Sequence, residues 1–459
     1  MGPTLETARA MAAAVADGRA TSEDLVRRAL DRLEAWQPVT NAFSQVWADD
    51  ALAAAREADR AVGSGEALGP LHGVPVAVKD LFDMAGRVST GCSRAYEGGT
   101  PATEDAEAVR SLRRAGAVVV GKTNQHELAC GATNLVSACG PTANPWDSSR
   151  ITGGSSGGSG AAVAAGVVPM ALGSDTGGSI RMPASLCGCW GLKPTTGRLP
   201  TTGMMPLAPG LDTPGPLVAD AGDLSLWWTV ATAGPPPDVQ PRGLRVGVLG
   251  GWFRTWTHPE TWSAVEAVAD VLGNLGAAVG EADGAGIEDV RRVWTDVAWA
   301  EFAEAHAWLV DRPDLLFEQT AASIRHGAEL DPDRLAASRA RVPAYGAWFA
   351  DRFEAFDVLV CPATPIPAPR ADDEEGTVEV VGGRRVDWRR GGALAWFTEP
   401  VNLGGVPALA VPAGRPTGGL PLGVQLVAAR GRDELLVGLA GALEAADARF
   451  RPGRPPLPF

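Results

Sequence analysis

The first part of the chain places apolar residues at helical spacing, with charged residues between them. Thr21 and Asp24 have the spacing of a capping box, and apolar residues recur every four positions from Leu25 onward. From residue 71 the pattern changes to short apolar runs separated by glycine and proline, which is typical of buried strands. We therefore predict a helical segment at residues 1–65 that packs as a shell.

Strands and helices alternate along most of the remaining chain. Residues 74–78 and 117–120 have the pattern of buried strands, and a helical pattern lies between them at residues 105–115. The same criteria predict strands at 244–249, 358–361 and 408–411, and helices at 260–275, 287–356 and 433–446. The alternation predicts an α/β fold, in which helices flank a mixed, largely parallel central sheet.

The sequence GPPPDVQPRG at residues 234–243 is the clearest break in the pattern. It has the composition of a domain boundary or of a long surface connection. Because strand and helix patterns resume directly after it, we favour one large domain over residues 1–459.

Composition and charge narrow the classes of protein. Of the 459 residues 45% are hydrophobic, and the formal net charge of −14 argues against binding nucleic acid or an anionic membrane. Six cysteines are too sparse for a disulfide scaffold and lack zinc-site spacing, which predicts reduced, mostly buried thiols. The chain has no basic leader and no apolar run of membrane-spanning length, so we expect a cytoplasmic protein.

Lys79 directly follows the apolar strand predicted at residues 74–78. If the strand carries its ammonium group into the interior, desolvation lowers the lysine pKa and produces a neutral amine, which is a base. The alternative is a surface lysine whose stem covers apolar residues.

The loop GGSSGGSG at residues 153–160 admits several interpretations. It lacks the GK[ST] ending of a phosphate-binding loop and does not fit G-x-G-x-x-G, which argues against nucleotide binding. It contains G-x-S-x-G twice, centred on Ser155 and Ser156, as in the nucleophile elbow of serine hydrolases. An elbow needs a preceding strand and a histidine base, but residues 144–152 carry a proline, an aspartate and consecutive serines, and no later histidine has a fitting context.

The segment GSDTGGSIR at residues 173–181 has a different character. Two glycines allow the backbone N–H groups of residues 176–179 to converge into a nest that binds an oxyanion. A nucleophilic Ser179 without a histidine needs a lysine that acts directly or through another hydroxyl, for which Ser155 is a candidate. Glycine turns with hydrogen-bonded serines are the alternative.

Together these motifs resemble the amidase signature family. GGSSGGSG, the AAVAAG after it and GSDTGGSIRMPASLCGCWGLKPT are similar to the signature, and LHGVPVAVKDLFD, GKTN and GPTANPWD resemble the motifs upstream of it. The match is dense over a signature core at residues 71–203 and continues through CPATPIPAP and VNLGGVPALAVPAG. The resemblance implies the amidase signature fold, with residues 244–459 completing the sheet and a variable, substrate-pocket region at about 252–390.

For the site, the resemblance implies a Ser-cisSer-Lys triad. Ser179 is the nucleophile, Ser155 follows a non-proline cis peptide and bridges the proton, and Lys79 is the base. The implied oxyanion hole consists of the N–H groups of Thr176, Gly177, Gly178 and Ser179. The implied supports of these loops are Ser156, Asp175 and Arg181.

The implied reaction is hydrolysis of a carboxylic amide to a carboxylate and ammonia or an amine, without a metal or organic cofactor. The expected partner is a small-molecule amide, and a homodimer is left open. One alternative is the glutaminase component of an aminoacyl-tRNA amidotransferase-like complex, which works with partner subunits, and another is a hydrolase of ureido or carbamoyl amides. An inactive binding protein is a third, which the intact lysine and serines argue against. Eight tryptophans at residues 252–390 point to an apolar or aromatic acyl group, although core packing explains each one singly.

Overall fold

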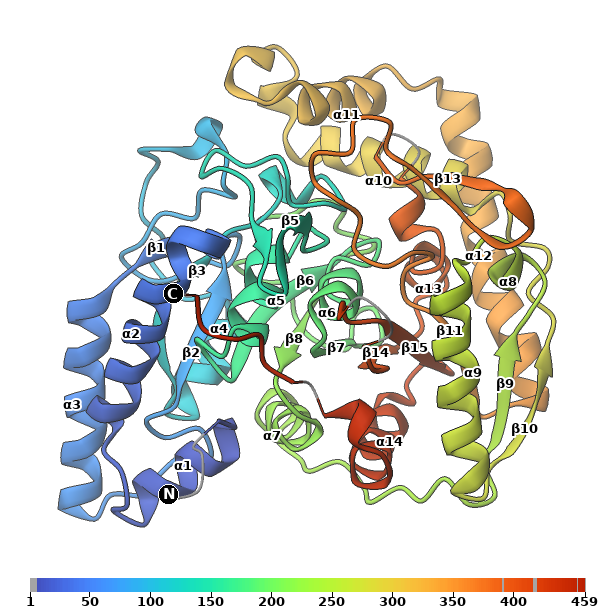
Figure 1. Ribbon diagram of the computed structural model, residues 1–459. Helices are drawn as coiled ribbons and strands as arrows, with labels where there is room; N and C mark the ends of the chain where they lie inside the picture. The colour runs from blue at the N-terminus through green and yellow to red at the C-terminus, as the bar shows by residue number, and fades with distance from the viewer. Residues whose placement is uncertain (1–5, 390–391, 416–418, 452, 459) are drawn as a thin grey trace.

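One sheet of eleven strands carries both halves of the chain (Figure 1). The computed structural model describes residues 6–389, 392–415, 419–451 and 453–458. In spatial order the strands are β1 (Phe43–Val46), β3 (Val118–Thr123), β2 (Pro75–Lys79), β6 (Met170–Asp175), β8 (Thr213–Val218), β7 (Trp190–Lys193), β14 (Ala408–Pro412), β15 (Gly423–Ala428), β11 (Val358–Pro362), β9 (Arg245–Leu249) and β10 (Ala278–Ala282). Two small hairpins pair β4 (Ala143–Asn144) with β5 (Asp147–Ile151) and β12 (Thr377–Glu379) with β13 (Arg385–Asp387).

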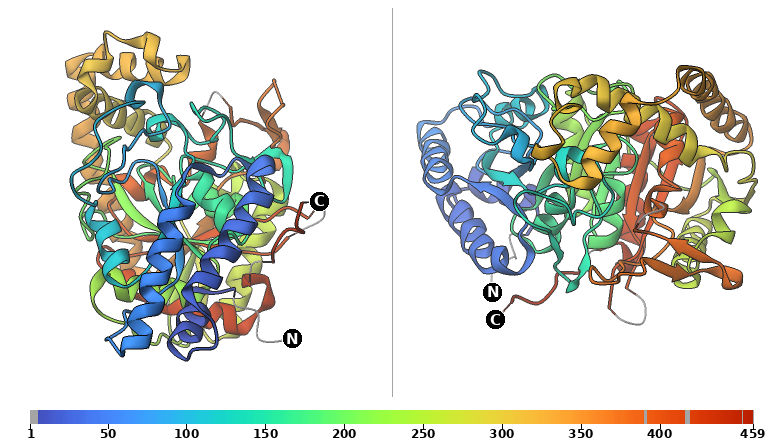
Figure 2. Two further views of the ribbon diagram at one scale, coloured as in Figure 1. Left: turned by 90° about the vertical axis from the view of Figure 1, so that its left-hand side faces the viewer. Right: turned by 90° about the horizontal axis from the view of Figure 1, so that it is seen from above.

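Helices cover both faces of this sheet. The first half of the chain contributes α1 (Ala8–Ala16), α2 (Ser22–Thr40), α3 (Ala48–Ser64), α4 (Glu107–Arg114), α5 (Gly157–Ala164), α6 (Arg181–Cys187) and α7 (Ala221–Thr232). The second half contributes α8 (Trp252–Thr255), α9 (Pro259–Asn274), α10 (Val290–Ala305), α11 (Glu318–Ala328), α12 (Pro332–Ala355), α13 (Glu399–Leu403) and α14 (Asp433–Ala446). The gold helices α10 and α11 gather at one end of the molecule (Figure 2).

The predicted α/β fold with a mixed sheet is confirmed. Pairs are parallel within the blocks β3-β2-β6 and β11-β9-β10, and the strands between these blocks pair antiparallel. The antiparallel share is larger than the alternation of helices and strands indicated. One reason is that the connections from β7 to β8 and from β14 to β15 contain no α-helix and join neighbouring strands directly.

Alternate residues of β2 point to opposite faces of the sheet, as the pleat requires. Val76 and Val78 belong to the apolar cluster that includes α4, α7, α9 and α14, whereas Ala77 belongs to the cluster that includes α2, α3, α5 and α6. Lys79 lies two residues after Ala77 and therefore extends toward the α5 side of the sheet. The position of Lys79 within β2 thus determines that its side chain lies on the face of the sheet that α5 covers.

The individual elements follow the predictions with three corrections. The first is that the helical region predicted at residues 287–356 divides into α10, α11 and α12. The helices predicted at residues 105–115, 260–275 and 433–446 are α4, α9 and α14. The segment 1–65 is not wholly helical, because the four-residue edge strand β1 interrupts it and pairs antiparallel with β3. The segment at residues 234–243 does not separate two domains. It joins α7 to β9, and β9 belongs to the same eleven-stranded sheet as the strands that precede α7.

The cysteines and helix lengths bear on the expected setting of the protein. All six cysteines are free thiols, and all but Cys139 are buried, as predicted. Among the described residues, no helix combines the length and the apolar character that crossing a bilayer demands.

Candidate active site

Lys79 ends β2 inside the protein and contacts two serines. Its side chain is fully buried, and its Nζ lies 2.7 Å from Ser155 Oγ and 2.8 Å from Ser174 Oγ. Burial lowers the pKa of Lys79 to about 7, although the carboxylates of Asp212 and Asp175 oppose this shift. At neutral pH a substantial fraction of the amine is therefore uncharged and can accept a proton.

Ser155 lies in a tightly packed turn that leads into α5. The Gly154–Ser155 peptide is cis, as the resemblance implied, and the Ser155 carbonyl accepts the N–H of His126 at 3.1 Å. A Cβ on Gly154 would lie 2.9 Å from the Asn134 nitrogen, and one on Gly158 would lie 2.3 Å from the Asn124 oxygen. These close approaches explain why the loop is rich in glycine.

Ser179 lies at the wall of a cavity of about 90 Å³, together with Gly177. Its side chain is nearly buried, with 6% of the residue exposed, and its Oγ has no hydrogen-bond partner among the described residues. The Ser179 carbonyl accepts the N–H of Ser156 at 3.2 Å, which joins the two serine loops. Sequence reasoning thus selected three side chains that the fold gathers around one pair of loops.

The N–H groups of the 176–179 turn divide into two sets. The Gly178 N–H donates to Asp175 Oδ1 at 2.9 Å, so it is already occupied and the implied oxyanion hole of four donors needs correction. The N–H groups of Thr176, Gly177 and Ser179 have no acceptor among the described residues. Three donors therefore stay unoccupied, and two of them belong to residues that line the cavity, Gly177 and Ser179.

Two side chains from distant segments hold this turn in place. Trp294 Nε1 on α10 donates to the Thr176 carbonyl at 3.0 Å, and Thr398 Oγ1 donates to the Gly177 carbonyl at 2.6 Å. Each carbonyl shares a rigid peptide plane with the next N–H group, so these two bonds fix the directions of the Gly177 and Gly178 N–H groups. Sequence reasoning did not identify Thr398, and it included Trp294 only as one of the eight tryptophans of the expected pocket region.

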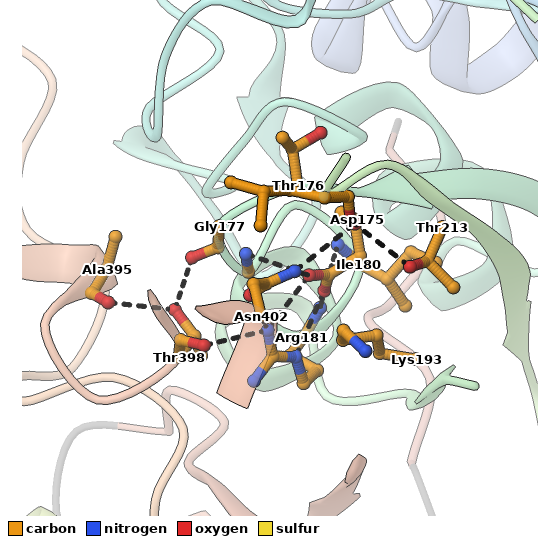
Figure 3. Close-up of polar contacts among 12 residues, drawn as sticks. Asp175, Thr176, Gly177, Ile180, Arg181, Lys193, Thr213, Ala395, Thr398 and Asn402 are labelled. Carbon is orange, nitrogen blue, oxygen red and sulfur yellow. Dashed lines mark hydrogen bonds and ion pairs between the residues drawn. The ribbon is translucent and has the colours of Figure 1, made fainter. Parts of the chain in front are cut away.

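The Asp175–Arg181 pair supports the turn from below and is completely buried (Figure 3). Arg181 donates to both Asp175 oxygens, to Asn402 Oδ1 at 2.6 Å and to the oxygen of Gln425 at 2.9 Å. Burial alone would raise the pKa of Asp175, but the Arg181 guanidinium outweighs it and holds that pKa well below its usual range. The implied supporting role of both residues agrees with these contacts.

Ser156 and Asp212 fix the neighbouring backbone. Ser156 Oγ bonds to both the carbonyl and the N–H of Ser174, at 3.2 and 3.3 Å. Asp212, which sequence reasoning missed, accepts the Thr176 hydroxyl at 2.5 Å and the N–H of Leu207 at 2.9 Å. Burial raises the pKa of Asp212 to about 6. Asp212 thus places a carboxylate near Lys79, and no motif in the sequence around Asp212 indicates this role.

A histidine-based elbow does not fit the structure, although one reason for excluding it was wrong. The strand β5 does precede the serine loop, but it lies outside the central sheet, where it pairs with β4 and forms a single bridge from Arg150 to Arg370. His126 bonds to the Ser155 carbonyl through its backbone, and its ring Nδ1 accepts the N–H of Asn134 at 3.2 Å. Burial, together with the charge of Lys79, lowers the pKa of His126 to about 3. No histidine ring bonds to Ser155 or Ser179 among the described residues.

The cavity wall combines aromatic and charged residues. Trp294, Trp299 and Trp388 line it, so three of the eight tryptophans predicted for a pocket region do border the site. The wall also contains Arg291 and Glu399, which form an ion pair. Within the described residues, no cluster of three or more histidine, cysteine or acidic side chains is arranged to hold a metal ion.

Comparisons with known proteins agree with this arrangement. The family described as Amidase matches residues 24–437. AtzE, the 1-carboxybiuret hydrolase component of Pseudomonas sp. (strain ADP), is 37% identical over 453 residues, covering 92% of this chain and 94% of the relative. The A component of the glutamyl-tRNA(Gln) amidotransferase of Acidothermus cellulolyticus is 38% identical, covering 98% of this chain and 95% of the relative. The crystal structure of an amidase has a TM-score of 0.89 and 33% identity, covering 95% of this chain and 98% of that one. The chain therefore belongs to the amidase signature family and is an amidohydrolase that acts on carbon–nitrogen bonds.

Proposed function

We propose that this chain hydrolyses carboxylic amides through a Ser-cisSer-Lys triad. Ser179 Oγ attacks the amide carbonyl carbon, its proton passes to Ser155 Oγ, and the Ser155 proton passes to the neutral Nζ of Lys79. The carbonyl oxygen becomes an oxyanion that accepts hydrogen bonds from the free N–H groups of the turn. One such donor is typically worth about 2.7 to 4 kcal/mol of barrier.

The proton then returns along the same path. Lys79 gives it back through Ser155 to the leaving nitrogen, the carbon–nitrogen bond breaks, and ammonia or an amine departs from the acyl-enzyme. A water molecule attacks the ester with the same relay acting as base, and the collapse of the second tetrahedral intermediate frees the carboxylate and restores Ser179. The proposed chemistry uses no metal or organic cofactor.

One observation carries this proposal: a fully buried Lys79 within 2.7 Å of Ser155 in the loop bonded to Ser179. A buried ammonium would ordinarily have an acidic partner, whereas the hydrogen bonds of this Nζ go to two hydroxyls. A lysine kept neutral beside hydroxyl groups is suited to move protons between them.

Labelling by a fluorophosphonate probe tests the proposal. We expect one adduct per chain on Ser179, found by mass spectrometry of peptides, and no adduct in folded Ser179→Ala. An unlabelled, folded wild-type protein would support a catalytically inactive binding protein instead.

The names of two relatives correspond to two narrower functions that the sequence left as alternatives. One is named as part of an amidotransferase and the other as part of a hydrolase for a carboxybiuret, which correspond to the glutaminase and ureido interpretations of the sequence. Size-exclusion chromatography with a glutaminase assay separates them, because strong activity of the isolated chain on simple amides and weak activity on glutamine argues against the amidotransferase role. The cytoplasmic location and a homodimer stay predictions.

A further inference from the structure

Arg291 and Glu399 form an ion pair at the wall of the cavity that Gly177 and Ser179 line. The pair belongs neither to the proposed triad nor to the network that holds the turn. Glu399 is completely buried, whereas the Arg291 side chain retains 35% of its exposure. Thr398, next to Glu399, donates to the Gly177 carbonyl, so the pair is fixed relative to the proposed oxyanion hole.

One carboxylate oxygen of Glu399 lacks a hydrogen-bond donor among the described residues. Oε1 accepts from Arg291, but Oε2 is buried and has no hydrogen-bond partner among the described residues. Burial raises the pKa of this carboxyl to about 7, while Arg291 opposes the shift. A buried unsatisfied acceptor is costly, and Glu399 is one of the residues that line the cavity. The free oxygen therefore points to a donor supplied by a ligand.

Arg291 presents unused donors beside this acceptor. Its guanidinium has five N–H groups, and Glu399 Oε1 is its one hydrogen-bond acceptor among the described residues. The guanidinium stacks over Trp294 at 5.3 Å, and a Cβ on Gly392 would lie 2.6 Å from its Cζ. These contacts hold the guanidinium in place beside the Glu399 carboxylate.

We propose that this pair binds a neutral carbamoyl group at the end of the substrate remote from the scissile amide. The carbonyl oxygen of that group accepts from Arg291 and its NH₂ donates to Glu399 Oε2. The preferred substrates are then compact amides whose acyl part ends in a carboxamide or ureido group. This inference rests on the proposed function, because it assumes that the acyl group on Ser179 occupies the cavity.

Charge and size exclude other end groups. A carboxylate would leave Glu399 Oε2 without a donor, and an ammonium would meet the charges of Arg291 and Arg389. A carbamoyl group supplies an acceptor for Arg291 and a donor for Oε2. The cavity volume of about 90 Å³ lies well below the roughly 300–1,000 Å³ of pockets for drug-sized ligands, which favours a short acyl chain.

Three amides with the same number of heavy atoms test the proposal on the wild-type protein: succinamide, 4-oxopentanamide and 4-methylpentanamide. We expect kcat/KM for succinamide to exceed that for 4-methylpentanamide at least about tenfold, with 4-oxopentanamide between them, because it offers only the acceptor. Equal values for the three amides, or a higher value for glutamine than for succinamide, would overturn the assignment.

Two variants test whether the pair produces this preference. In Arg291→Gln and Glu399→Gln we expect the ratio between succinamide and 4-methylpentanamide to fall below about threefold, whereas a general structural defect slows both substrates equally. Arg292→Gln is the matched control, because the neighbouring Arg292 bonds to Ser338 and Asp289 and should leave the ratio intact. If a variant fails to fold, the wild-type series still decides.

The failure of this inference differs from the failure of the proposed function. A protein that the fluorophosphonate probe labels on Ser179, but that does not prefer succinamide, overturns only the carbamoyl assignment. A folded protein that neither takes the label nor hydrolyses any of these amides overturns the proposed function itself.

Discussion

Gly178 and Thr398 lie so close together that no side chain fits between them. A Cβ at position 178 would lie 2.2 Å from Thr398 Oγ1, and the φ of Gly178 is +124°, in the region that side chains rarely adopt. The same Thr398 hydroxyl holds the Gly177 carbonyl at 2.6 Å. The segment before α13 is thus interlocked with the turn that carries the candidate nucleophile.

Gly178→Ala should separate these segments and misplace the N–H groups beside it. We expect kcat to fall about a hundredfold, which is the effect of losing one oxyanion donor, in steady-state hydrolysis of a simple amide. Gly197→Ala is the control, because Gly197 also has a positive φ of +81° but nothing within 4 Å of the added Cβ. Equal activity of the two variants would show that the turn does not hold the oxyanion.

Replacing Lys79 with methionine should remove the base and keep the volume. We expect kcat to fall about a thousandfold or more, as for other members of a catalytic triad. Lys122→Met is the matched control, because Lys122 is also buried in a strand but pairs with Asp80 at 3.3 Å. It should lower the thermal midpoint and change kcat less than about tenfold. A Lys79→Met protein with a tenth of normal activity would exclude the lysine base.

The pH dependence follows from the neutral lysine. Because the pKa of Lys79 is lowered to about 7, the active amine is scarce below pH 7 and dominant above it. For an uncharged amide, kcat/KM should rise about tenfold per unit at acid pH and level off on the alkaline side.

Asp212→Asn checks the assignment of this titration. Removing the nearby carboxylate removes a charge that raises the pKa of Lys79, so the midpoint should move to lower pH by roughly one unit or less. A rate that is flat from about pH 6 to 9, or a midpoint that moves upward in the variant, would contradict a lysine base.

The buried Arg181 should be worth far more to stability than an exposed arginine. Arg181→Met leaves Asp175 charged and buried, and we expect the free energy of unfolding to fall by about 3 to 5 kcal/mol in urea titrations. Arg339→Met breaks the exposed pair with Glu304, 3.3 Å long, and should cost about 1 kcal/mol or less. Similar losses for the two variants would show that the Asp175 network does not anchor the fold.

His126 offers a direct choice between a lysine and a histidine base. Asparagine can replace its Nδ1 as the acceptor of the Asn134 N–H, so His126→Asn should fold and keep kcat within about tenfold. If the folded variant instead loses as much activity as Ser179→Ala, the elbow interpretation returns.

Local patterns predicted the elements that local forces determine. The boundaries of α9 and α14 follow the 3.6-residue period, and the Thr21 hydroxyl does accept the Asp24 N–H as the capping-box spacing indicated. The strand β1 was not predicted, because four residues are too few to show the alternation of apolar and polar positions that identifies a strand. The structure of β1 depends on pairing with β3, which is too far along the chain for a local sequence pattern to include both strands.

The site divides in the same way. Lys79, Ser155 and Ser179 stand in motifs whose composition is unusual by itself. Arg291 and Glu399 are 108 residues apart, and each stands in an ordinary stretch of polar and apolar residues. Their contact arises from the packing of α10 against α13, so only the folded chain reveals it.

Arg181 hydrogen-bonds to Asn402, 221 residues further along the chain, and to Gln425, 244 residues further. During synthesis, the ribosome releases the whole serine-rich region long before it makes these partners. A nascent chain that stalls before α13 carries every motif of the proposed chemistry but lacks the anchors of its central guanidinium and of the Gly177 carbonyl. The hydrolase is therefore built to become competent only near the end of translation, and truncated products should be inert.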